Sequence, residues 1–248
     1  MCVEYTLPKN SLYKTAEVRG RERRWRIINE VLDAEAQKSK KRDKSSMASS
    51  SVSWNQLSTA FPLKEVVFPR RDIPDDELLE LYKYLQKVHK LYGIVWSGAE
   101  AKRLQFISPV INYVCALLPD VEISVEEDMR GVNVHANGRF EYVIKYRDRK
   151  ICIVEAKKED FEQGLIQCLL GCEVLADTES FPVVYGIVTN YVQWNFYECG
   201  SEMVRNEAIV LYTASREEVA HAEIATLKDL TAIIYEMLTS VSNFKLST

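Results

Sequence analysis

The sequence of 248 residues contains no run of 18 or more apolar residues, which is the length that a membrane-spanning helix requires. Its first twenty residues also lack the uninterrupted apolar stretch of a signal peptide. We therefore expect an intracellular chain, in the cytoplasm or the nucleus, with no membrane partner. With 47% hydrophobic and 27% charged residues, the composition is that of a globular protein with a sizeable core. Wholly disordered and collagen-like classes are excluded.

Common catalytic and metal-binding signatures are also missing. No GxGxxG loop, Walker loop or GxSxG elbow occurs, so nucleotide-dependent and serine-hydrolase chemistry have no support. Only three histidines are present, which excludes a His-rich metal site. The six cysteines form no CxxC pair and lie mostly in apolar runs, which predicts free buried thiols rather than a zinc site or disulfides.

Charge is unevenly distributed along the chain. Residues 1–50 carry twelve Lys and Arg against seven Asp and Glu, a net charge of +5, whereas residues 51–248 carry 20 against 29, a net charge of −9. A basic arm ahead of an acidic body indicates an anionic partner that is contacted mainly through the arm. The same asymmetry argues against a broad basic surface for nucleic acid.

The basic arm is predicted to contain one amphipathic helix over residues 21–36, with Trp25, Ile28 and Leu32 on its apolar stripe. The charged side chains expected to face water are Arg23, Arg24, Arg26 and Glu30. Residues 37–53 are rich in Lys, Arg and Ser and almost free of apolar residues, which is typical of a disordered linker.

This pattern divides the chain into a basic helical arm with a disordered linker, residues 1–53, and a folded domain, residues 54–248. Within the linker, residues 41–44 (KRDK) resemble a short nuclear-import signal. A solvated linker explains the same four residues equally well.

The body shows helical patterns, then a β-meander, a helix and further strands, which predicts an α/β fold with a mixed sheet and extra helices at the N- and C-terminal ends. One helix is opened by Pro74 and ended by Gly93, and a second begins at Ser97, with Glu100 completing a capping box. Strands are expected over residues 121–126, 139–146, 150–156, 183–189, 192–197 and 208–212. Further helices are expected over residues 161–175 and 227–241.

The stretch from residue 138 to residue 167 carries the most chemical information. Arg147-Asp148-Arg149 marks a hairpin tip, and a register centred on Asp148 places Glu141 directly opposite Glu155. Opposed side chains of antiparallel strands lie about 5 Å apart, so two carboxylates there require a cation or a shared proton. Alternation along the strand places Lys157 on the same face as Glu155.

Two carboxylates, a backbone carbonyl and waters are suitable ligands for Mg²⁺, with Mn²⁺ as a substitute, and such an ion activates water and polarises phosphate oxygens. Lys157 would stabilise developing negative charge or help to deprotonate the attacking water. The alternative is purely structural: Lys157 neutralises Glu155 on a surface strand, and Glu141 pairs with Lys145 or an arginine. A slip of one residue would move Glu141 to the other face.

This region contains, in order, a helix with a glutamate, a strand with an acidic residue, a strand ending in Glu-x-Lys and a helix with a glutamine. This array resembles the PD-(D/E)XK nuclease superfamily. The resemblance covers residues 97–190 and implies a restriction-endonuclease-like αβββαβ core. By position, Glu141 matches the first acidic site, Glu155-Ala156-Lys157 the Glu-x-Lys motif, Gln167 or Gln163 the glutamine and Glu100 the helix glutamate. The sequence departs from the family at Phe140-Glu141, where the family has Pro-Asp.

The implied activity is metal-dependent hydrolysis of phosphodiesters, with the metal held by Glu141, Glu155 and the Ala156 carbonyl. Lys157 would assist the water or the scissile phosphate, Gln167 would orient the nucleophile or the lysine, and Glu100 would support the metal. Nucleic acid is the implied partner, DNA before RNA, and the oligomeric state stays open, with a homodimer among the options. The rival interpretation is a catalytically inactive effector or interaction module that keeps the fold and binds nucleic acid or protein.

Three segments within this region, FISPVI (106–111), GRFEYVI (138–144) and ICIVEAKKEDFEQGLIQ (151–167), are similar to the nuclease-type C-terminal domains of Crinkler effectors. That resemblance implies an effector that acts in the nucleus of a host cell. Further along the chain, Trp194, Phe196 and Tyr197 are able to stack on bases, although aromatic residues in a strand are more often packing residues.

Overall fold

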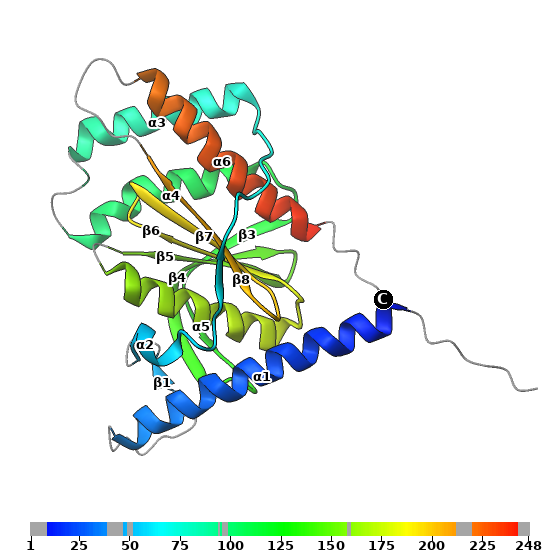
Figure 1. Ribbon diagram of the computed structural model, residues 1–248. Coiled ribbons are helices and arrows are strands. Elements are labelled where there is room, and N and C mark those ends of the chain that lie inside the picture. Colours follow the sequence, from blue (N-terminus) through cyan, green and yellow to red (C-terminus); the bar gives the residue numbers. More distant parts are fainter. Residues whose placement is uncertain are drawn as a thin grey trace, which may run out of the picture.

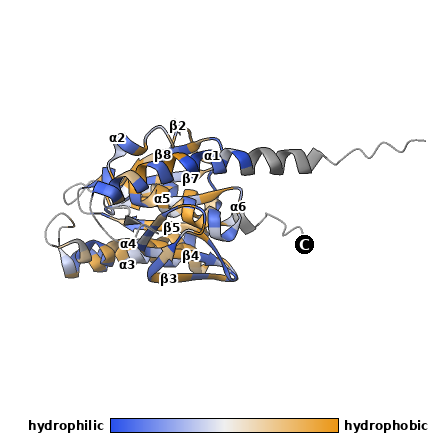
Figure 2. Ribbon diagram, turned by 90° about the horizontal axis from the view of Figure 1, so that it is seen from below, coloured by the Kyte–Doolittle hydropathy of each residue, from blue (hydrophilic) through white to orange (hydrophobic). Residues whose placement is uncertain are grey.

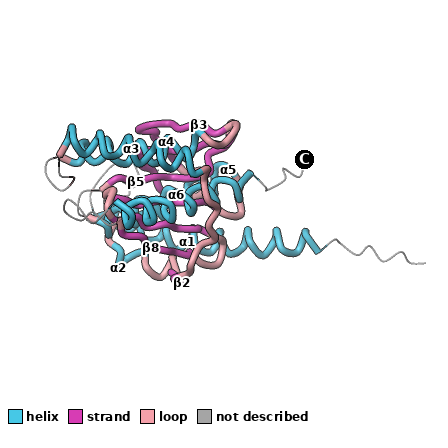
Figure 3. Tube along the Cα trace, turned by 90° about the horizontal axis from the view of Figure 1, so that it is seen from above, coloured by secondary structure: helices cyan, strands magenta, loops and turns pink. Residues whose placement is uncertain are grey.

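The computed structural model describes residues 9–38, 47–48, 52–93, 95, 99–157, 160–211 and 220–242, without the side chains of residues 9–18, 47–48, 100, 220–222 and 241–242. Its centre is a mixed sheet with helices on both faces (Figure 1). The helices α3, α4 and α6 cover one face, and α5 and α1 cover the other (Figures 1 and 3). The predicted α/β class with a mixed sheet is therefore confirmed.

The helices are α1 (Lys9–Lys38), α2 (Trp54–Leu57), α3 (Asp75–Tyr92), α4 (Glu100–Ala116), α5 (Phe161–Glu179) and α6 (Ala220–Ser242). The strands are β1 (Met47–Ala48), β2 (Leu63–Glu65), β3 (Val121–Arg130), β4 (Ala136–Tyr146), β5 (Arg149–Ala156), β6 (Val184–Thr189), β7 (Gln193–Cys199) and β8 (Val204–Val210). The run α4-β3-β4-β5-α5-β6 has the predicted αβββαβ order. Sequence periodicity misses only the shortest elements, α2, β1 and β2, because two to four residues show no period.

The order of strands is β1-β4-β5-β6-β7-β8-β2, and β3 also pairs with β4. β5 and β6 are parallel and are joined through α5, whereas β4–β5, β6–β7 and β7–β8 are antiparallel. β6 is buried along its whole length, as its continuous apolar sequence predicts for a strand covered on both faces. The carboxyl ends of β5 and β6 therefore lie side by side at one edge of the sheet.

Two predicted boundaries are corrected. α4 begins at Glu100 after Ala99, which has no side-chain cap bond, so Ser97 is not the N-cap; Ser97 itself lies outside the described residues. The hairpin tip is a two-residue turn, Arg147–Asp148, with Tyr146 opposite Arg149. Arg147 adopts a φ of 54°, the left-handed conformation that lets a tight turn form here without glycine.

A β-bulge restores the predicted register further along the hairpin. The pairing shifts between Ile144 and Lys145, after which Tyr142 lies opposite Val154. The pairing of the two strands ends at Tyr142 and Val154, one residue before Glu141 and Glu155, so Glu141 opposite Glu155 stays a prediction.

Two hydrophobic cores lie on the two faces of the sheet (Figure 2). Trp194 and Phe196 are fully buried and Tyr197 is 7% exposed, so they are packing residues and not a surface for base stacking. The predicted free buried thiols are confirmed for the five cysteines that the structure describes, Cys115, Cys152, Cys168, Cys172 and Cys199. In the described helices, no segment is both long and apolar enough to cross a membrane.

The helix α1 extends beyond the predicted range at both ends and packs against the body through buried Ile28, Leu32 and Ala36. Arg23 and Arg26 are exposed, as predicted, but the prediction that Arg24 faces water is wrong, because this side chain is buried. The predicted disordered linker falls largely outside the described residues, and the domain boundary at residue 54 stays a prediction.

Candidate functional site

The strand β5 ends in a buried charged pair. Glu155 is 2% exposed, and its Oε2 lies 3.1 Å from Nζ of Lys157. The backbone N–H of Lys157 donates to the Thr189 carbonyl at the end of β6, 2.8 Å away, which fixes the chain just after the strand. This segment, Glu155-Ala156-Lys157, is called the β5 end below.

The first turns of α5 pack against the β5 end. Asp160 caps the helix by accepting from the backbone N–H of Gln163, 2.9 Å away. The stem of Lys157 fills the space beside Gly164, since a Cβ there would come within 2.8 Å of Lys157 Cγ. Gln167 follows almost one helical turn later, and its buried Oε1 has no hydrogen-bond partner in the part of the chain that the structure describes. The β5 end and Gln167 thus lie on adjoining elements.

Glu141 is half-buried and lies next to Tyr142. Burial raises the pKa of the Tyr142 hydroxyl, and the negative charge of Glu141 raises it further, whereas the hydrogen bond between the Tyr142 and Ser108 hydroxyls, at 2.6 Å, opposes the shift. Glu141 therefore belongs to the same hairpin as Glu155, next to the α4 layer.

The structural alternative paired Glu141 with Lys145, but Lys145 has a different partner. Its Nζ lies 3.0 Å from Oε2 of Glu127, and Nζ of Lys150 lies 2.6 Å from Oε1 of the same residue. Burial by itself would raise the pKa of Glu127, but the two ammonium groups outweigh it and lower that pKa. Glu127 of β3 thus forms ion pairs with both Lys145 and Lys150 of the β4–β5 hairpin.

The other predicted site residue, Glu100, is the first residue of α4. Its backbone position is at the start of the helix, and its side chain lies outside the described residues. One turn into α4 lies Arg103, which is 2% exposed and was not among the predicted site residues. The signal was present, because Arg103 precedes Phe106 and Ile107 by three and four residues and so interrupts the apolar stripe of the helix.

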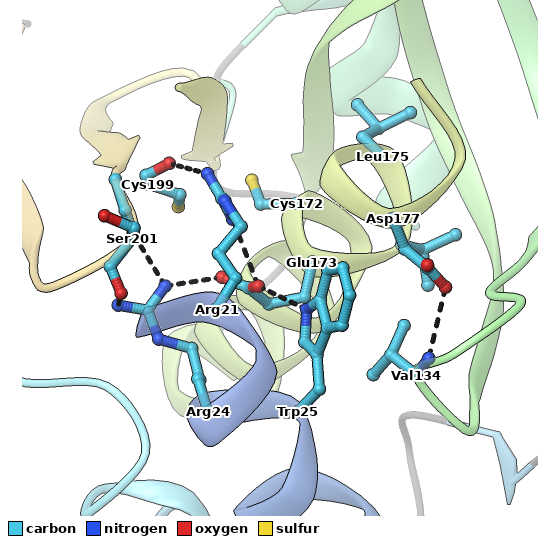
Figure 4. Close-up of polar contacts among 12 residues, drawn as sticks. Arg21, Arg24, Trp25, Val134, Cys172, Glu173, Leu175, Asp177, Cys199 and Ser201 are labelled. Atoms are coloured by element: carbon cyan, nitrogen blue, oxygen red, sulfur yellow. Dashed lines mark hydrogen bonds and ion pairs between the residues drawn. The ribbon is translucent and has the colours of Figure 1, made fainter. Parts of the chain in front are cut away.

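A second buried charged cluster, also missed, holds α1 against α5 (Figure 4). Glu173 is fully buried and its two carboxylate oxygens lie 3.1 Å from Nη1 of Arg21 and 2.6 Å from Nη1 of Arg24. The indole N–H of Trp25 donates to the same carboxylate, 2.8 Å away. These four residues are called the Glu173 cluster.

Comparison with known proteins found no family model that matches the chain. Over 190 residues the chain is 38% identical to Crinkler effector protein 5 of Phytophthora infestans, a match that covers 76% of this chain and 54% of that protein. The matched part of this chain is therefore similar to a Crinkler effector. It spans about half the length of this relative. The Crinkler part of the predicted resemblance is thus supported, while membership of the PD-(D/E)XK superfamily stays a prediction.

The donor atoms near the β5 end determine which kind of metal ion could bind there. Among the described side chains, no group of three or more His, Cys, Asp or Glu is placed to hold a metal ion. The donors at hand are oxygens: the carboxylates of Glu155 and Glu141, the Ala156 carbonyl and the unpartnered Oε1 of Gln167. Mg²⁺ binds such oxygen sets through one or two carboxylates and keeps several waters, so the residues fit that ion rather than zinc.

Proposed function

We propose that this chain is a metal-dependent nuclease domain of an effector protein, which hydrolyses phosphodiester bonds of DNA or RNA. The observation that carries the proposal is the β5 end, where a buried glutamate and a lysine pair at 3.1 Å, while the adjoining helix α5 carries the buried Oε1 of Gln167, which has no hydrogen-bond partner among the described residues. The αβββαβ order around this segment supports it. The relative's name supports the effector role, for which the host-cell nucleus is the expected place of action.

In this proposal, Glu141, Glu155 and the Ala156 carbonyl would hold Mg²⁺ or Mn²⁺, and Glu100 would support them from the start of α4. The ion supplies polarisation of a phosphate oxygen and a lower pKa of the attacking water. The ammonium of Lys157, fixed by Glu155, offsets the negative charge that develops on the phosphate. The Oε1 of Gln167 accepts a hydrogen bond from the attacking water and so orients it.

The test is cleavage of fluorescent DNA and RNA oligonucleotides in Mg²⁺ or Mn²⁺ by wild type, Glu155→Gln and Lys157→Met. We expect each variant to lose activity by about 100-fold or more, since removing one preorganised charge stabiliser costs that much. Glu127→Gln is the matched control, because it removes a carboxylate that binds two lysines on the same sheet. A Glu155→Gln protein that is folded and cleaves as fast as wild type would refute the proposal.

A second candidate function is an effector module that binds its partner without catalysis. Two observations favour it: the Lys157 ammonium already neutralises Glu155, and the net charge of residues 51–248 is −9. For this function we expect wild type to bind oligonucleotides or protein without cleaving them in any divalent ion. Binding of nucleic acid through the basic arm would weaken steeply with salt and on deletion of residues 1–50.

A further inference from the structure

Among the residues that the structure describes, no carboxylate pairs with the buried guanidinium of Arg103. Its Nε and Nη1 are inaccessible to solvent and make no hydrogen bond to any residue that the structure describes. The buried guanidinium of Arg24 differs, since it reaches Glu173 and the carbonyls of Ala60, Gly200 and Ser201. A buried charge without a partner is strongly unfavourable, so the environment of Arg103 is incomplete as it stands.

Two contacts of α4 fix the level of Arg103 along the sheet. Ser108 bonds Tyr142, which lies opposite Val154 of β5, and the ring of Phe106 lies 5.1 Å from that of Tyr191, just after β6. The helix thus runs with its N-terminus toward the carboxyl ends of β5 and β6.

From Ser108 to Arg103 the helix rises about 7.5 Å, roughly the length of two strand residues. Two residues beyond Val154 is Ala156, in the middle of the β5 end. Arg103 therefore reaches the edge of the sheet where Glu155 and Lys157 lie, and it does so from the α4 layer, whereas Gln167 belongs to the α5 layer on the other face.

The start of α4 adds to the positive potential at this place. The helix has 17 residues, and its N-cap, Ala99, offers no side-chain bond to the first N–H groups. The helix dipole favours an anion there. The unpartnered guanidinium is an independent sign of the same ligand, because its planar fork matches two oxygens of a phosphate.

We propose that Arg103, together with the first turn of α4, binds a phosphate group of the nucleic acid at the β5 end and so positions it beside Lys157. The proposal rests on the proposed nuclease function for the source of the phosphate, which is a phosphodiester of DNA or RNA rather than free phosphate. Arg103 is a substrate-binding residue in this arrangement, and it acts from the face of the sheet opposite to Gln167.

Three proteins test it: wild type, Arg103→Met, and Lys87→Met as a control that removes a positive charge from an exposed position on the neighbouring α3. Without phosphate, we expect Arg103→Met to have an equal or higher melting temperature, since it removes an unpartnered buried charge. Inorganic phosphate at constant ionic strength should raise the melting temperature of wild type and Lys87→Met, but not that of Arg103→Met. A lower melting temperature of Arg103→Met with an unchanged phosphate response would show that Arg103 is structural and would overturn the proposal.

A second arm identifies the source of the phosphate. Binding of a short duplex oligonucleotide in Ca²⁺ is measured by fluorescence anisotropy at several salt concentrations. We expect Arg103→Met to bind about 10-fold more weakly, with a salt slope smaller by about one, as for the loss of one phosphate contact. Unchanged oligonucleotide binding, despite a lost response to inorganic phosphate, would overturn the assignment to nucleic acid.

Arg103→Lys separates charge from geometry, because it keeps the charge and loses the planar fork. We expect it to recover only part of the oligonucleotide binding. The outcome is independent of catalysis: an Arg103 effect on binding stands even if Glu155→Gln cleaves normally, which would refute only the nuclease. Conversely, loss of cleavage in Glu155→Gln with no binding effect of Arg103→Met would refute only this inference.

Discussion

The Glu173 cluster and the β5 end both bury charged side chains, but they differ in how many hydrogen-bond partners the described residues supply. In the Glu173 cluster, the only buried side-chain atom without such a partner is Nε of Arg21. Each oxygen of Glu173 binds a guanidinium, and Trp25 donates to one of them. At the β5 end, Glu155 and Lys157 pair, while on the neighbouring helices Gln167 Oε1 of α5 and two nitrogens of Arg103 of α4 have no hydrogen-bond partner in the described structure. A polar network with most of its groups satisfied holds a structure together, whereas each unsatisfied buried group needs an explanation, of which a bound ligand is one.

The contrast predicts different costs for the same chemical change. Glu173→Gln leaves Arg21 and Arg24 buried with only an uncharged amide between them. We expect it to lower the free energy of unfolding by about 3 kcal/mol or more, measured by urea denaturation. Glu202→Gln is the control, because its contact with Arg23, at 3.4 Å, is exposed and such pairs contribute less than about 1 kcal/mol. Equal costs at the two positions would mean that α1 is not held by Glu173.

At the β5 end, we expect Glu155→Gln to lower the free energy of unfolding by only about 1 kcal/mol, because one lysine at 16% exposure remains and its charge is partly solvated. Urea denaturation of Glu155→Gln beside Glu173→Gln makes the comparison direct. A Glu155→Gln protein destabilised as much as Glu173→Gln would make the β5 end a structural ion pair and would favour the non-catalytic effector.

Sequence patterns found the fold because its central elements have strong periods: β6 is a continuous apolar run, and α3 follows helical spacing from Pro74 to Gly93. They found Glu155 and Lys157 because the two residues are local in sequence. They missed the Glu173 cluster, since Arg24 and Glu173 lie 149 residues apart and only the tertiary fold brings them together. Local patterning therefore mistook Arg24 for a solvated residue.

The hairpin shows the same limit on a smaller scale. The predicted register is right for Tyr142 opposite Val154 although the predicted tip is wrong, because a β-bulge near Ile144 compensates for the two-residue turn. Neither the bulge nor the left-handed conformation of Arg147 could be predicted from the sequence, because no glycine occurs at either position. Arg103 differs, since an arginine in an apolar stripe is visible in the sequence, and only the absence of a partner requires the structure.

Glu127 differs from both Glu173 and Glu155, because it is partly exposed and yet forms ion pairs with two lysines, Lys145 and Lys150. Its folded pKa is lowered from the ordinary value of 4.5. A lowered carboxyl pKa contributes stability that is complete above the unfolded pKa and is lost as pH falls through the folded pKa. We therefore expect Glu127→Gln to be less stable than wild type by about 0.5 kcal/mol at pH 7, after allowance for solvent screening.

As the pH falls below 4.5 and through the lower folded pKa of Glu127, wild type loses the charge of this carboxylate, and the difference between wild type and Glu127→Gln should shrink. Urea denaturation at pH 7 and pH 3 measures it. Glu126→Gln is the control, because its contact with Arg139 is exposed on the same strand and should matter little at either pH. If the difference at Glu127 persisted at pH 3, its two lysines would not be the cause, and Lys145 would again be available to Glu141.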